Sequence, residues 1–85
     1  STSTNPNAES FAVSVYPNPA SSLVRFSAPQ VIEQATLVDI SGRVLDVFEP
    51  SSERFEIPID RLVNGIYFVR IKAQTGQTVV KFIKE

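Results

Sequence analysis

Residues 62–85 read LVNGIYFVRIKAQTGQTVVKFIKE, and this stretch decides the fold. It contains two runs of strand-forming residues, 65–73 and 78–84, joined by a two-residue loop at Thr75-Gly76. The second run continues almost to the last residue, where most domains have a frayed polar tail. The sequence therefore predicts a β-hairpin whose final strand is either held in a sheet or bound by a partner.

The register of this hairpin follows from matching apolar residues across the two strands. With that loop, the expected apolar pairs are Ile71–Val80, Val69–Phe82 and Phe68–Ile83. The same register places Arg70 opposite Lys81, with Lys72 beside them. Because opposed like charges destabilise a strand pair by up to about 1 kcal/mol, we expect compensation. It would come from an acidic neighbour such as Glu53 or Glu56, or from an anionic partner.

The rest of the chain reads as short strands separated by turns. Alternating apolar residues predict strands at residues 11–16, 23–27, 35–39, 43–49 and 54–59. Residues 28–34 are expected to connect two of these strands. Because no segment has helical periodicity, the predicted fold class is all-β: a small immunoglobulin-like antiparallel β-sandwich of about seven strands. The order of the strands stays open.

Turn residues mark the ends of these strands. The residues expected to hold the turns are Pro17, Asn18, Pro19, Asp39, Gly42, Asn64, Gly65 and Gly76. Asp39 and Gly42 occupy the first and fourth positions of a type I turn, with Gly42 at a left-handed bulge position. The expected pairs in that hairpin are Val38–Val44, Leu37–Leu45 and Asp39–Arg43. Asn64-Gly65 is expected to supply positive φ angles and to place Leu62 on the core.

Length and composition limit the chain to one small domain of 85 residues, 42% of them apolar. Residues 1–10 are polar and are expected to form a flexible linker to an upstream passenger, which leaves residues 11–85 as the domain. Because the chain contains no Met, we expect it to be a piece of a longer polypeptide. Without Cys, packing and sheet hydrogen bonds must hold the fold. No run is long and apolar enough to span a membrane.

The chain lacks the residues on which most catalytic sites depend. It contains no His and no Cys, which removes the commonest general base, the thiol nucleophile and the usual transition-metal ligands. The carboxylates show no calcium-loop pattern, and a domain this small has little concave surface for a glycosidase pair. Asp39 and Arg43 are interpreted as a turn-capping pair. We therefore expect no enzyme activity, no cofactor and no metal site.

Charge is distributed unevenly along the chain. Residues 1–60 carry three Arg against eight acidic residues, a net charge of −5, whereas residues 61–85 carry five Lys or Arg against one Glu, a net charge of +4. The two halves could attract each other across a solvated surface, or the basic hairpin could bind an anionic partner. Nucleic acid is a poor candidate because the pI is about 5.3 and no recognition helix is apparent.

Three segments together resemble a known family. They are YPNPA (residues 16–20), VDISGRV (residues 38–44), and LVNGIYFVRI (residues 62–71) followed by KFIK (residues 81–84). In this order and spacing they resemble the type A C-terminal sorting domains of the bacterial type IX secretion system, over nearly all of residues 11–85. Glu85 departs from the pattern, since many members end on a basic residue.

The resemblance implies that the domain is an address label for secretion. A parent protein would enter the periplasm by its own signal peptide, and this domain would direct it through the outer-membrane translocon with the help of shuttle proteins. A sortase-like cysteine peptidase would cleave within residues 1–10, and the passenger would be joined to lipopolysaccharide or released. The recognition residues would be Lys81, Phe82, Ile83 and Lys84, with Arg70 and Lys72 nearby. A partner could pair with the strand edge or read its side chains.

Two other classes of function stay open. A spacer or adhesion module of a secreted enzyme needs only to fold, so no motif argues against it. A carbohydrate-binding module would need a flat aromatic platform. The chain has no Trp, and its Tyr residues are Tyr16 and Tyr67, of which Tyr67 is expected to point inward.

Overall fold

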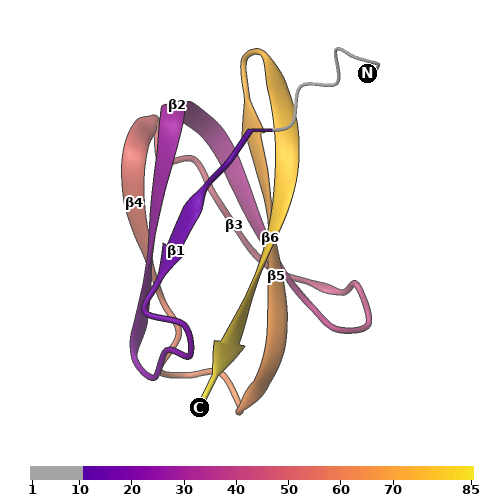
Figure 1. The fold of residues 1–85 in the computed structure, drawn as a ribbon. Helices are drawn as coiled ribbons and strands as arrows, with labels where there is room; N and C mark the ends of the chain where they lie inside the picture. The colour runs from indigo at the N-terminus through magenta and orange to yellow at the C-terminus, as the bar shows by residue number, and fades with distance from the viewer. Residues whose placement is uncertain (1–10) are drawn as a thin grey trace.

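The computed structural model describes residues 11–85, which form an all-β fold without a helix (Figure 1). The strands are β1 (Ser14–Tyr16), β2 (Leu23–Asp39), β3 (Val44–Phe48), β4 (Ser52–Pro58), β5 (Gly65–Ala73) and β6 (Gly76–Lys84). They form one antiparallel sheet that curls on itself around a single core. The predicted fold class is confirmed, with six strands in place of about seven. The predicted linker, residues 1–10, lies outside the described residues.

The strand β2 crosses the molecule and belongs to both layers of the curled sheet (Figure 1). Residues 23–27 pair with β4, and residues 25–27 also with β1, whereas residues 35–38 pair with β3 and β5. The expectation that residues 28–34 form a connection is therefore wrong. Ala28 and Ile32 are buried, so core positions continue through this segment. Irregularities in the ladder on both sides of Ile32 allow the strand to bend without ending.

The core lies between the two layers and is filled by the inward side chains of every long strand. In the first layer Val24 and Phe26 are buried, as predicted, and the Phe26 ring stacks on Phe55 with centroids 4.8 Å apart. In the second layer Tyr67 and Phe82 stack with centroids 5.6 Å apart. Aromatic stacking of this kind adds to the stabilisation from burial alone.

The turn between β2 and β3 has the geometry that the sequence predicts. Gly42 donates its N–H to the Asp39 carbonyl at 2.9 Å, and the Asp39 N–H donates to the Arg43 carbonyl at 3.0 Å. Gly42 has a φ of +90°, a conformation that disfavours residues with a Cβ. Val38 pairs with Val44, but Leu37 pairs with Asp46 and not with Leu45, because the ladder shifts between Leu37 and Val38.

The closing hairpin has a different register from the predicted one. Val80 pairs with Val69, Val79 with Arg70 and Lys81 with Phe68, so Arg70 and Lys81 are not opposed. The loop consists of residues 74 and 75, and Gly76 is already the first residue of β6. The predicted register is wrong by two positions, a shift that leaves every side chain on its original face. The observed register instead pairs Tyr67 with Phe82 in the core.

The segment between β4 and β5 packs Leu62 against the core, as predicted. The Tyr67 hydroxyl donates to the Val63 carbonyl at 2.6 Å and so fastens this loop to β5. Gly65 has the predicted positive φ, at +157°, whereas Asn64 does not have a positive φ. The predicted positive φ at Asn64 is therefore wrong.

Candidate functional site

The predicted recognition residues lie on β6, the last strand of the sheet and one of its edges. Lys81 is exposed and Ile83 is partly exposed, and both point to the outer face. Phe82 and Lys84 point to the opposite face, where they are 0% and 8% exposed. The structure therefore divides these four residues between a surface pair and a buried pair, because side chains alternate along a strand.

The two buried side chains of β6 hold the strand in place. Phe82 stacks on Tyr67 inside the core. Lys84 directs its Nζ toward the Asn64 Oδ1 at 3.4 Å, and no carboxylate among residues 11–85 pairs with it. The residue is 8% exposed, so the aliphatic stem of Lys84 contributes to seating the strand while the amino group keeps this one polar contact.

Arg70 and Lys72 are exposed on the outer face of β5, the same face that carries Lys81. Arg70 is the diagonal neighbour of Lys81, since it pairs directly with Val79. Among residues 11–85, none of these three cations forms an ion pair with a carboxylate. The outer face of the closing hairpin is therefore basic, with exposed apolar residues such as Val79 (58% exposed) between the charges.

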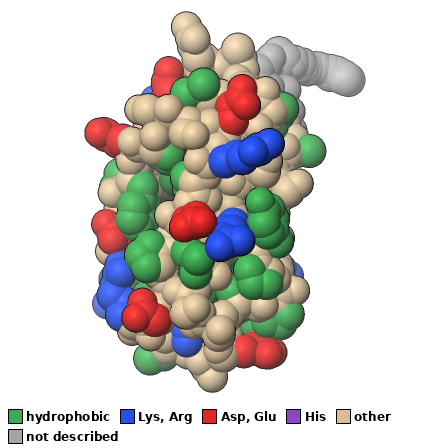
Figure 2. Space-filling view, turned by 90° about the vertical axis from the view of Figure 1, so that its left-hand side faces the viewer, with side chains coloured by type: hydrophobic (Ala, Val, Ile, Leu, Met, Phe, Trp, Pro, Cys, Tyr) green, Lys and Arg blue, Asp and Glu red, His purple; other side chains and the backbone are tan. Residues whose placement is uncertain are grey.

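Two acidic side chains, Glu56 and Asp46, pair with arginines away from the closing hairpin. Glu56 accepts from the Arg25 Nε at 3.0 Å, and Asp46 accepts from Arg61 at 2.9 Å. The expectation that Glu53 or Glu56 compensates the hairpin cations is therefore wrong. Glu56 lies opposite Arg25 across the β2–β4 ladder, and among residues 11–85 neither Glu forms an ion pair with Arg70 or Lys81. Acidic and basic side chains are interspersed over the face on the β4 side of the molecule (Figure 2).

Asn18 closes part of the β6 edge, a role that the sequence analysis did not anticipate. Its amide donates to the Lys81 carbonyl at 3.3 Å and accepts from the Ile83 N–H at 3.0 Å. Ala20 continues the contact: its N–H donates to the Ile83 carbonyl at 2.8 Å, and its carbonyl accepts from Glu85 at 2.9 Å. The sequence signal for this contact was the position of Asn18 between two prolines. Proline has no N–H, so in this segment the Asn18 side chain is the group that offers both a donor and an acceptor.

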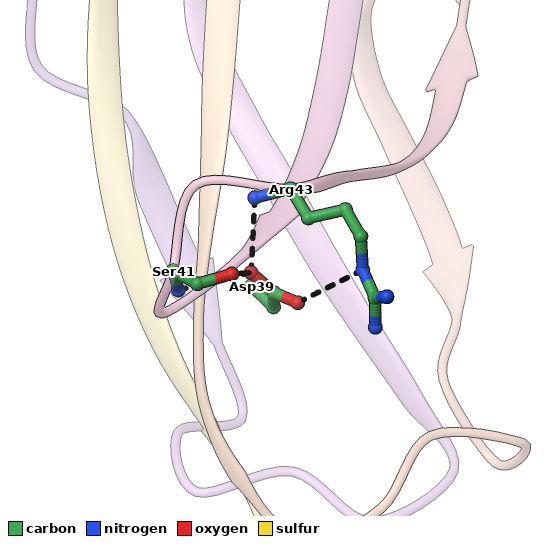
Figure 3. A network of polar contacts seen from close by, with 3 residues as sticks. All are labelled: Asp39, Ser41 and Arg43. Carbon is green, nitrogen blue, oxygen red and sulfur yellow. Dashed lines mark hydrogen bonds and ion pairs between the residues drawn. The ribbon is translucent and has the colours of Figure 1, made fainter.

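The Asp39 carboxylate organises the β2–β3 turn (Figure 3). Its Oδ1 accepts from the Ser41 hydroxyl at 2.6 Å, the Arg43 N–H at 3.0 Å and the Ser41 N–H at 2.9 Å. Its Oδ2 lies 3.5 Å from the Arg43 Nε. The Ser41 hydroxyl first, and then the Arg43 N–H, lower the pKa of Asp39 below its usual value of 3.8. A carboxylate saturated in this way is a structural cap.

Within residues 11–85, the structure contains no cluster of three or more potential metal ligands from His, Cys, Asp and Glu side chains. The same part of the chain has no helix that is long and apolar enough to cross a membrane. A hollow of about 380 Å³ lies between the Asp39–Arg43 turn and the 61–67 segment. Its two basic side chains, Arg43 and Arg61, are paired with Asp39 and Asp46.

Comparison with known proteins gives a family match and a similar solved structure. A family model described as a secretion system C-terminal sorting domain matches residues 14–85. Among solved structures, PorZ of Porphyromonas gingivalis, described as an essential bacterial surface component of the type-IX secretion system, has a similar fold with a TM-score of 0.74. The match has 20% sequence identity and covers 87% of this chain but 11% of the PorZ chain. No curated protein matched.

The network around Asp39 predicts a pH-dependent contribution to stability. Because the folded-state pKa is lowered, the stabilisation is complete above the ordinary Asp pKa and is lost as the pH falls through the folded-state pKa. We expect Asp39→Asn to lower the Tm at about pH 7, and this difference to shrink below about pH 4. Thermal unfolding followed by circular dichroism measures both. A Tm difference that stays constant down to about pH 2 would contradict the assignment.

The two faces of β6 predict opposite outcomes for neighbouring substitutions. Phe82→Ala should reduce the free energy of unfolding by about 3–5 kcal/mol, because it removes a buried ring from the core. Lys81→Ala, the matched control one residue away, should change it by less than about 0.5 kcal/mol. Urea unfolding of the two variants and the parent chain gives the comparison. A similar loss of unfolding free energy in both variants would contradict the assignment of Phe82 to the core and Lys81 to the surface.

Proposed function

The chain belongs to the family of secretion system C-terminal sorting domains, and we propose that it directs a protein attached to its N-terminal side through the type IX outer-membrane translocon. The observation that carries this proposal is the family match, which spans residues 14–85 and so includes the closing hairpin to its end. The ordered, basic outer face of that hairpin supports a role in recognition.

We infer a division of the chain into two parts. Residues 11–85 act as the sorting domain, and residues 1–10 act as the linker to the passenger. A sortase-like cysteine peptidase cleaves in that linker after export, since cleavage there leaves the folded domain intact. The parent protein passes through the periplasm and ends at the cell surface or outside the cell, where the passenger is either joined to lipopolysaccharide or released.

The predicted recognition residues divide into two roles in this proposal. Lys81, Arg70 and Lys72 present positive charge to the translocon or its shuttle proteins, with Ile83 beside them. Phe82 and Lys84 act by keeping β6 seated on the core, so that the outer residues keep their spacing. Removing residues 81–85 would remove both roles together, because Phe82 is a core residue. Substitutions on the outer face separate recognition from folding.

Export of a fused reporter tests the proposed function. We expect an inert reporter, with a signal peptide and this 85-residue chain at its C-terminus, to reach the surface or the medium of a type IX host. The same fusion in a strain without the translocon, and the reporter without the chain, should stay in the periplasm. Fractionation and immunoblotting measure the distribution. Equal export with and without the chain would refute the proposal.

Charge reversal on the outer face tests the recognition residues. Arg70→Glu and Lys81→Glu should each reduce export several-fold, because steering by charge speeds the docking of complementary surfaces. Arg54→Glu makes the same change in charge at an exposed position of β4 and serves as the matched control. All three variants should keep their thermal stability. Unchanged export of the Arg70 and Lys81 variants would eliminate an anionic contact at this face.

A further inference from the structure

The backbone of β6 has one side bonded to β5 and one side facing away from it. The contacts of Asn18 and Ala20 identify the outward groups, because they reach the Lys81 carbonyl and both the N–H and the carbonyl of Ile83. Backbone groups alternate along an antiparallel strand, and the β5–β6 ladder has no shift from Gly65 to Lys84. The N–H and carbonyl groups of Gln77 and Val79 therefore also point away from β5.

Among residues 11–85, this outward side is covered at one end of β6 and open at the other. Asn18 and Ala20 cover the stretch from the Lys81 carbonyl to the Glu85 N–H. Among residues 11–85, β5 is the only strand that pairs with Gln77 to Val79. A hollow of about 420 Å³ lies beside this open stretch, lined by Arg70, Gln77, Thr78 and Val79. An exposed edge of this kind is a template for another strand.

The side chains around the open edge define what kind of strand fits. Val79 is 58% exposed on the outer face, and Arg70 and Lys81 lie on that face without a carboxylate partner among the described residues. A strand added beside β6 would place every second side chain on this face. Carboxylates at those positions would meet Arg70 and Lys81. A second copy of β6 would instead bring two sets of like charges together.

We propose that an extended segment carrying carboxylate side chains, from a protein of the export machinery, adds as a strand to the β6 edge at Gln77 to Val79. This inference rests on the proposed function for the source of the segment. Main-chain hydrogen bonds to Gln77 and Val79 supply the affinity, and the pairing of carboxylates with Arg70 and Lys81 selects the sequence. Edge addition thus explains how a partner engages a strand whose inward side chains are buried.

A proline at position 79 tests the backbone contact. Val79→Pro removes the outward N–H without touching the bonds to β5, and proline is tolerated on edge strands. Val79→Ala shortens the side chain but keeps the N–H, so it is the matched control. We expect the alanine variant to be exported as the parent fusion is, and the proline variant to be exported about tenfold less. Thermal unfolding checks that both are folded, and Gln77→Pro replaces Val79→Pro if that variant is not.

A peptide probe tests the edge without the export machinery. A blocked peptide of alternating Glu and Val residues should slow hydrogen exchange at the Gln77 and Val79 amides of the isotope-labelled chain, whereas the matching Lys and Val peptide should not. The proline variant should bind the acidic peptide about tenfold more weakly. Protection of the Val79 amide in the chain alone, or no protection with the acidic peptide, would overturn the inference.

The outcomes separate the two proposals. If the parent fusion stays in the periplasm while the acidic peptide still protects Val79, the export function fails and the edge site stands. If the proline variant is folded and exported like the parent, the edge inference fails and the export function stands. Sedimentation that shows self-association of the parent chain, abolished by Val79→Pro, would identify a second copy as the occupant and overturn the proposed partner.

Discussion

The alternation of side chains along β6 is the constraint on which the rest of the structure depends. Phe82 and Lys84 are committed to the inner face, where Phe82 stacks on Tyr67 and the Lys84 amino group lies near Asn64. While the domain stays folded, the side chains of β6 that can contact another molecule are the outward ones, such as Val79, Lys81 and Ile83. A partner that recognises this strand therefore reads half of its side chains and, along the open part of the edge, its backbone.

The second constraint is the continuous strand β2, which pairs with four other strands. Because one strand supplies ladder partners in both layers, the layers cannot slide relative to each other without breaking β2 hydrogen bonds. Its bend at the irregular positions around Ile32 brings the first layer against the second and encloses Phe26 and Phe82 in one core. The position of the closing hairpin thus follows from the geometry of a strand far away in the sequence.

Local chemistry could be predicted from the sequence, and long-range geometry could not. The β2–β3 turn could be predicted because Asp39 is typical of the first position of a type I turn and Gly42 of its fourth, so both residues indicate the same turn. The β5–β6 register was missed because a shift of two residues leaves the pattern of inward and outward residues unchanged. The clasp by Asn18 joins positions 65 residues apart, a pairing that no local pattern specifies. The placement of Phe82 and Ile83 on opposite faces follows from the strand period, but which face is buried depends on how the sheet packs.

The contacts of the described residues bear on the two explanations of the uneven charge. If the acidic and basic halves attracted each other, the hairpin cations would be paired with carboxylates of the first sixty residues. Two of the three ion pairs lie entirely within residues 1–60, and the third joins Arg61, at the start of the basic half, to Asp46. Arg70, Lys72 and Lys81 take part in none of these pairs, so no ion pair within residues 11–85 ties these cations to the acidic half. Surface ion pairs contribute about 0–1 kcal/mol each, and leaving these cations unpaired costs the fold little while keeping them available to a partner.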